Sequence, residues 1–279
     1  MKINKWNGER LDYCSVLEDE FAHHITRYEF CKQFVKGKKV LDAACGVGYG
    51  SYYLKRFGNA DIVYGIDISE ESINEAIGYF GNYTNNLIYL VHNVEKTSFK
   101  NMQFDVVVSL ETFEHVSNLE NYLNEIQRIL KKGGKFIVST PNKKFYTGAG
   151  ILNKYHINEM YKEEFEFSLL KFFNIEALYY QLCPFIKIEN SYPSLLNFVK
   201  KNLKIFIPSA NYFKRKIDLL KYVYKIKQHG VNRNYGKEFE KFIDDKKNLI
   251  YLYRILKVEH YINIYNEKMG NFLAVCSNV

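Results

Sequence analysis

The stretch VLDAACGVGYGS, residues 40–51, places three glycines at alternate positions directly after a short apolar run: Gly46, Gly48 and Gly50. Loops of this kind cradle part of a nucleotide-like cofactor, because glycine permits tight turns and a close approach of the backbone. A dinucleotide site requires the spacing G-x-G-x-x-G, whereas here the third glycine comes one residue early. The loop therefore predicts a nucleotide-like cofactor and argues against a dinucleotide.

Asp42 ends the apolar run, four residues before Gly46. A carboxylate at this position repels a pyrophosphate and attracts an ammonium group. S-adenosylmethionine has no phosphate and carries both a sulfonium and an ammonium, so the charges favour it as the cofactor.

Two further polar residues end the next two apolar runs. Asp67 follows the second run at the distance where an acidic side chain accepts hydrogen bonds from ribose hydroxyls, and Asn93 follows the third, where its amide suits an adenine edge. A residue of this kind taken alone more often belongs to a turn or a helix cap. Their succession at strand ends favours a cofactor site.

The segment LETFEHV follows the fourth apolar run and brings together Glu111, Glu114 and His115. We predict His115 as the general base, since imidazole titrates near neutral pH; the alternative is a histidine at a helix start, bonded to a backbone carbonyl. His156, in KYHINEM, is the second candidate base. The glutamates and His115 could also hold a divalent cation, but the sequence does not show that they converge, so no metal is predicted.

Apolar runs and helical patterns alternate along the first 182 residues, as in a parallel sheet covered on both faces. The pattern predicts helices and strands at the following residues: helices at 18–35, 51–58, 69–81, 119–134 and 162–173; strands at 38–44, 61–68, 87–91, 104–110, 135–140, 174–181 and 270–279. Ligands of such sheets bind at the carboxyl ends of the strands. His23 and His24, in the first helix, either face that site or have a packing or surface role.

A basic segment separates the last two predicted strands. Residues 183–270 hold 18 Lys and Arg against 8 Asp and Glu, a net charge of +10 in a chain that carries +8. Amphipathic patterns at 194–207, 211–228 and 238–257 predict helices. We therefore expect a cofactor-binding core at 1–182 and 270–279 and a helical insertion at 183–269. Its charge suits phosphates, anionic lipid or nucleic acid, or simply belongs to solvated helix faces.

The remaining composition favours a cytoplasmic protein. Five scattered cysteines without a CxxC pair argue against a disulfide framework or a zinc site. The sequence contains no apolar run long enough to span a membrane, and its first residues do not resemble a signal peptide.

Four ordered motifs, VLDAACGVGYGS, VYGIDIS, FDVVVSLETFEHV and LKKGGKFIVSTPN, resemble those of class I S-adenosylmethionine-dependent methyltransferases. HHITRYEF and HINEM are similar to a subgroup of bacterial small-molecule enzymes, related to the ubiquinone-biosynthesis O-methyltransferases, of which many act in surface-glycan pathways. The resemblance covers about residues 18–182 and the last ten; the basic segment lies outside it, and Asn93 stands where many relatives have Asp.

The resemblance implies a Rossmann-like, doubly wound α/β fold whose seven-stranded sheet is mostly parallel, with an antiparallel last strand inserted between the fifth and sixth. It further implies a set of cofactor contacts: Arg27 to the methionine carboxylate, Gly46 and Gly48 to the methionine part, Asp67 and Ile68 to the ribose and one adenine face, Asn93 and Val94 to the adenine, and Leu110 to the pocket wall. Arg27 is equally consistent with a surface arginine. Some ubiquinone-pathway relatives imply a divalent cation.

The leading hypothesis is O-methylation of a sugar, a nucleotide-sugar or another small phosphorylated precursor in surface-glycan biosynthesis. One alternative is an RNA ribose methyltransferase; base methylation is disfavoured, because SLETFEH lacks the Pro-Pro-aromatic motif that stacks a flipped base. Another is a non-catalytic scaffold with the same fold, against which the intact glycine loop and Asp67 argue. A small-molecule acceptor is thus the expected partner, nucleic acid is not expected, and peripheral membrane contact through the basic segment stays open.

Overall fold

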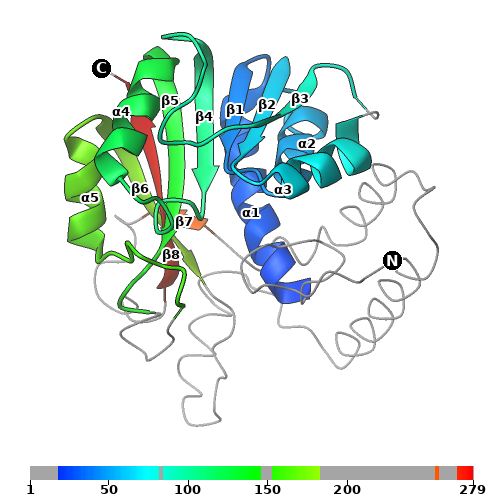
Figure 1. Cartoon of the computed structure of the whole chain (residues 1–279). Helices are drawn as coiled ribbons and strands as arrows, with labels where there is room; N and C mark the ends of the chain where they lie inside the picture. Colours follow the sequence, from blue (N-terminus) through cyan, green and yellow to red (C-terminus); the bar gives the residue numbers. More distant parts are fainter. Residues whose placement is uncertain (1–17, 82–83, 146–152, 183–254, 258–268, 279) are drawn as a thin grey trace.

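A single twisted sheet runs through the computed structural model, which describes residues 18–81, 84–145, 153–182, 255–257 and 269–278 (Figure 1). Its strand order is β3-β2-β1-β4-β5-β8-β6-β7. The strands are β1 (Lys39–Ala43), β2 (Ile62–Asp67), β3 (Leu87–Val91), β4 (Phe104–Leu110), β5 (Leu130–Pro141), β6 (Asn174–Leu182), β7 (Ile255–Lys257) and β8 (Met269–Ser277). Strands β1 to β5 are parallel, and β8 is antiparallel to both β5 and β6. The predicted placement of the last strand between the fifth and the sixth is confirmed.

Helices cover both faces of this sheet, as predicted from the alternation of strands and helices. They are α1 (Glu18–Val35), α2 (Tyr49–Arg56), α3 (Glu70–Ala76) with its π-helical extension η1 (Ile77–Gly81), α4 (Leu119–Ile129) and α5 (Lys162–Leu170). Successive strand residues alternate between the two cores: Val40 packs with α1, α2 and α3, whereas Leu41 packs with α4 and α5. Figure 1 shows the two helical layers on either side of the sheet. The sheet is therefore doubly wound.

The sheet has one strand more than predicted. Ile255–Lys257 pairs with the outer edge of β6 as β7, although these residues end the segment expected to be a helix at 238–257. Pairing with an open strand edge satisfies their backbone groups, which local periodicity does not anticipate. The rest of the expected helical insertion lies outside the described residues.

Helix α4 ends earlier than predicted. It was expected to continue to the glycines at 133–134, but Leu130 is already extended and begins β5. Asn278, from the residues after β8, donates its side-chain amide to the carbonyls of Gln127 and Leu130. A distant residue thus caps the last turn of the helix, and Gly133, at φ 66, turns the chain beyond it.

Ser69 caps the start of helix α3, where its hydroxyl accepts a hydrogen bond from the backbone N–H of Ser72 at 3.2 Å. The strand order reverses direction between β1 and β4, so the carboxyl ends of these strands flank the topological switch point at which ligands of doubly wound sheets bind. Among the described helices, none has the length and apolar character of a membrane span.

Candidate cofactor and acceptor site

The glycine loop adopts a backbone that suits glycine at two positions. Gly46 and Gly48 have φ values of 54° and 85°. A side chain at Gly46 would meet no neighbour within 4 Å, so this Cα faces open space. At Gly48, an added Cβ would lie 2.6 Å from Ala76 and 2.8 Å from the Tyr89 ring. Gly46 therefore leaves room for a ligand, while Gly48 is required by packing; cofactor contacts at both positions remain predictions.

The third glycine, Gly50, has a packing role as well. An added Cβ would lie 1.9 Å from the Tyr28 ring, so this position lets α2 lie close against α1. This contact accounts for the third glycine of the loop without any ligand.

Asp67 joins the loops that follow β1 and β2. Its Oδ2 accepts a hydrogen bond from the backbone of Gly46 at 2.9 Å, and its Oδ1 accepts one from Ser69 at 2.9 Å. The next residue, Ile68, is 69% exposed at this edge, although it is a large apolar side chain. A half-buried carboxylate beside an exposed apolar side chain would suit the ribose and the flat face of an adenine, and these contacts of Asp67 and Ile68 remain predictions.

Asp42 lies inside the protein beneath the glycine loop and is fully buried. Its carboxylate accepts hydrogen bonds from the Ser51 hydroxyl at 2.7 Å and from the Tyr28 hydroxyl at 3.3 Å. Burial raises the pKa of Asp42 to about 7, against the smaller opposing effect of these hydroxyls. Asp42 thus ties α1 and α2 to β1, and its attraction for a cofactor ammonium remains a prediction.

Arg27 is fully buried, which argues against the surface arginine that was the alternative from the sequence. Its Nη1 donates to Gln181 Oε1 at 2.7 Å, and its Nη2 lies 3.7 Å from Glu111 Oε2. Within the described residues, Nε and Nη2 have no hydrogen-bond acceptor. Buried guanidinium N–H groups without acceptors are costly, so an acceptor that is not part of the protein fits here. The methionine carboxylate of S-adenosylmethionine meets that requirement.

The expected adenine end lies after β3. Asn93 is exposed, and its Oδ1 accepts a hydrogen bond from the backbone of Glu95 at 2.8 Å. This is the turn role that was the alternative for an isolated residue, and it leaves the amide nitrogen as the group to meet an adenine. Val94 and Leu110 are almost fully buried at the same edge of the sheet.

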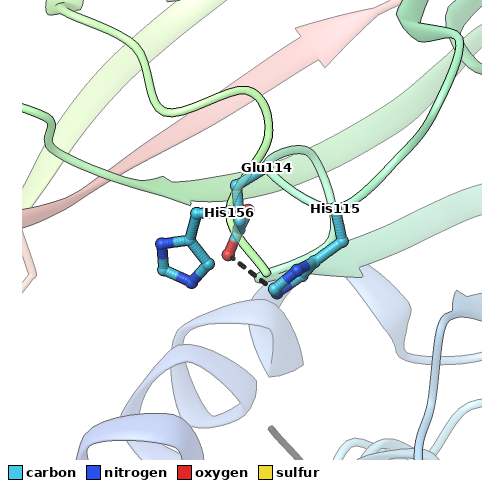
Figure 2. Close-up of side chains that lie close together, drawn as sticks. All are labelled: Glu114, His115 and His156. Carbon is cyan, nitrogen blue, oxygen red and sulfur yellow. Dashed lines mark ion pairs between the residues drawn. The ribbon is translucent and has the colours of Figure 1, made fainter. Parts of the chain in front are cut away.

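Glu114 and His115 follow the carboxyl end of β4, and Figure 2 shows their side chains close to that of His156. Their ligand atoms all lie within 4.8 Å of one another, and the two imidazole rings are 5.0 Å apart. Glu111 belongs elsewhere: its carboxylate accepts hydrogen bonds from Ser139 and Asn271, each at 2.6 Å. The sequence grouped Glu111 with Glu114 and His115, whereas in the structure the third member of this cluster is His156.

The two histidines of this group differ in their hydrogen bonds. His115 Nδ1 lies 3.1 Å from the Tyr155 carbonyl, which can only accept, so Nδ1 carries the proton and Nε2 the lone pair. His156 donates from Nδ1 to Glu159 at 2.5 Å and accepts at Nε2 from the Asn153 amide at 2.9 Å. Both nitrogens of His156 are therefore engaged. His115 Nε2 lies 3.7 Å from Glu114 Oε1, and the role of His115 as general base remains a prediction.

A divalent cation could be held by Glu114, His115 and His156, since a carboxylate and two imidazoles are suitable ligands. Glu114 is 1% exposed, and burial together with the charge of Glu111 raises the pKa of Glu114 well above its usual value. A metal would therefore have to displace a proton from this carboxyl group.

Several residues that shape the site carried no signal in the sequence. Gln181 contacts Arg27, which is 154 positions away in the chain, and Asn271 contacts Glu111, which is 160 positions away. His23 and His24 lie beside Arg27, and burial together with its charge lowers the pKa of both histidines. Both imidazoles are therefore neutral at pH 7, and Arg27 carries the positive charge here.

Comparison with known proteins shows which families the chain is similar to. Residues 41–138 match the methyltransferase domain family. The chain is 33% identical over 125 residues to the mitochondrial ubiquinone biosynthesis O-methyltransferase of Dictyostelium discoideum, covering 40% of this chain and 37% of the relative. It is also 33% identical over 111 residues to the Coxiella burnetii ubiquinone biosynthesis O-methyltransferase, covering 40% and 47%. The chain thus spans less than half the length of these relatives.

A solved structure from Haloferax volcanii, a putative methyltransferase in complex with the Trm112 methyltransferase activator, superimposes with a TM-score of 0.57 at 18% identity, covering 94% of this chain and 92% of that one. This likeness concerns the fold alone. The fold, the glycine loop and the family match over residues 41–138 together support a class I S-adenosylmethionine-dependent methyltransferase. The cofactor of this family is S-adenosylmethionine.

Proposed function

We propose that the protein is an S-adenosylmethionine-dependent O-methyltransferase acting on a small molecule. The observation that carries the proposal is His115, which follows β4 at the carboxyl edge that flanks the switch point, with Nδ1 facing the Tyr155 carbonyl and Nε2 lying 3.7 Å from Glu114 Oε1. The bound cofactor supplies an activated methyl group on a sulfonium. The protein then has to align the acceptor and remove the proton of its hydroxyl, which is the role we assign to His115.

Two observations bear on the acceptor. The curated relatives are ubiquinone biosynthesis O-methyltransferases, which supports oxygen as the methylated atom. The basic segment at 183–270 supports an anionic acceptor, such as a nucleotide-sugar or another phosphorylated precursor in surface-glycan biosynthesis.

A screen for transfer of tritiated methyl groups tests the proposal. It should include nucleotide-sugars, glycan extracts, ubiquinone precursors and RNA. We expect transfer to a nucleotide-sugar or glycan precursor. Transfer to RNA alone would favour the ribose methyltransferase, and cofactor binding without transfer to any class would favour a scaffold.

The cofactor assignment predicts a specific loss of affinity. Asp67→Ala should weaken S-adenosylmethionine binding at least ~10-fold, because the ribose would lose a charge-assisted hydrogen bond worth roughly 1.5–3 kcal/mol. Isothermal titration calorimetry measures the change. Asp61→Ala is the matched control, since Asp61 is an exposed aspartate at the other end of β2. Unchanged affinity in a folded Asp67→Ala protein would remove Asp67 from the site.

We further propose that the basic insertion at 183–269 is a lid that contributes to acceptor specificity. Replacing Lys214, Arg215 and Lys216 with serine should raise the acceptor KM about 10-fold or more and leave cofactor affinity alone, since each charge-assisted contact is worth roughly 1.5–3 kcal/mol. Steady-state kinetics measure both. The exposed Lys36 and Lys38, at the opposite edge of the sheet, provide a control pair.

Sedimentation with anionic liposomes separates the lid from membrane docking. The lid predicts little binding even at low salt, where surface attraction is strongest. Strong, salt-sensitive binding together with an unaltered acceptor KM in the triple variant would contradict it.

A further inference from the structure

Two buried amides lie side by side where β6 meets β8. Gln181 and Asn271 are paired across these strands, and both are fully buried. Gln181 accepts a hydrogen bond from Arg27 Nη1 at 2.7 Å and donates from Nε2 to the carbonyl of His23 at 2.8 Å. The Gln181 amide thus forms hydrogen bonds both to the backbone of α1, at His23, and to the guanidinium of Arg27 in the same helix.

The contact with Gln181 leaves a particular edge of the guanidinium open. Nε and Nη2 form one edge of this planar group, and they are the two Arg27 nitrogens that have no acceptor within the described residues. Two parallel N–H groups in this arrangement match a carboxylate, which they bind in a bidentate manner. The remaining nitrogen, Nη1, donates its hydrogen bond to Gln181. This bond fixes the orientation of the guanidinium and therefore the direction in which the Nε–Nη2 edge points.

A negative charge is held next to this edge. Glu111 Oε2 lies 3.7 Å from Arg27 Nη2, too far for a hydrogen bond, and its carboxylate is fixed by Asn271 and Ser139. Glu111 adopts φ 53°, a conformation that non-glycine residues rarely take. A phosphate would meet this carboxylate unfavourably, whereas a zwitterionic amino acid offers a carboxylate to Arg27 and an ammonium to Glu111.

We propose that Gln181 is a positioning residue that orients the Nε–Nη2 edge of Arg27 toward the carboxylate of the cofactor's amino-acid end. The inference rests on the proposed function, because it takes S-adenosylmethionine as the ligand. Asn271 has the corresponding role for Glu111. Gln181 itself contacts the protein and not the ligand.

Two ligands that differ in the amino-acid end test this role. S-adenosylhomocysteine carries that end, and 5′-methylthioadenosine lacks it. Calorimetry with Gln181→Met, which keeps the side-chain length but removes the amide, should show about 10-fold weaker binding of S-adenosylhomocysteine. Binding of 5′-methylthioadenosine should not change. Gln127→Met is the matched control, since Gln127 donates to the Phe172 carbonyl on the other face of the sheet; it should leave both affinities unaltered.

Each other outcome overturns the inference in a distinguishable way. Equal weakening of both ligands by Gln181→Met would show a general structural role. Unchanged affinity for both would show that Arg27 needs no positioning by Gln181. A wild-type protein that binds neither ligand would overturn the proposed function itself, and the inference with it.

Discussion

Gly46→Val is expected to abolish S-adenosylmethionine binding, with a loss of about 100-fold or more in affinity. The Gly46 Cα faces open space at the edge of the sheet, next to Asp67, to which its backbone N–H donates. A branched side chain would occupy the space that the methionine part of the cofactor requires. Calorimetry with S-adenosylmethionine measures the effect.

Backbone strain has to be separated from blocked binding. Valine in the left-handed conformation of Gly46 lowers the stability of the fold by about 1–2 kcal/mol, and this cost is independent of ligand binding. Gly37 is a matched control: it has φ 67° and equally open surroundings, but it precedes β1, at the opposite edge of the sheet. Gly37→Val should lose similar stability in chemical denaturation and bind the cofactor normally. If Gly46→Val also binds normally, the glycine-loop assignment is wrong.

His115→Ala is expected to lower kcat by about 100-fold or more, because the acceptor hydroxyl would lose its general base. Cofactor affinity should change little, since the residue acts on the acceptor. The measurement is steady-state kinetics with the acceptor that the methyl-transfer screen identifies, alongside calorimetry with S-adenosylmethionine.

His156→Ala is the informative comparison. It should have a smaller effect on kcat, because both nitrogens of His156 are engaged by Glu159 and Asn153. Recovery of His115→Ala activity on addition of Mg²⁺ or Mn²⁺ would indicate a metal site formed with Glu114 instead of a base. A fully active His115→Ala protein, with His156→Ala inactive, would reverse the two roles.

Local sequence determined most of the scaffold of this protein. The alternation of Val40 and Leu41 between two cores follows from the two-residue period of a strand. The cap by Ser69 involves residues three positions apart. The same short-range pattern predicts that Asp67 ends a strand. Because parallel strands have their carboxyl ends at one edge of the sheet, this also predicts the edge at which Asp67 lies.

Contacts between distant segments decided the rest. The sequence placed Glu111 with Glu114 and His115, whereas pairing of β5 with β8 brings Ser139 and Asn271 to Glu111 and turns it toward Arg27. In the same way Asn278 ends α4 at Ile129, ahead of the glycines that were expected to end it.

Gln181 shows the physical reason for this division. In NIEALYYQL it is one polar residue at the end of an apolar strand, with no spacing to distinguish it. Its role arises only because β6 pairs with β8 and α1 packs against the sheet, which brings Arg27 within 2.7 Å across 154 positions. Periodicity and capping are encoded within a few residues, whereas hydrogen bonds between buried side chains depend on the register of strands that are distant in the chain.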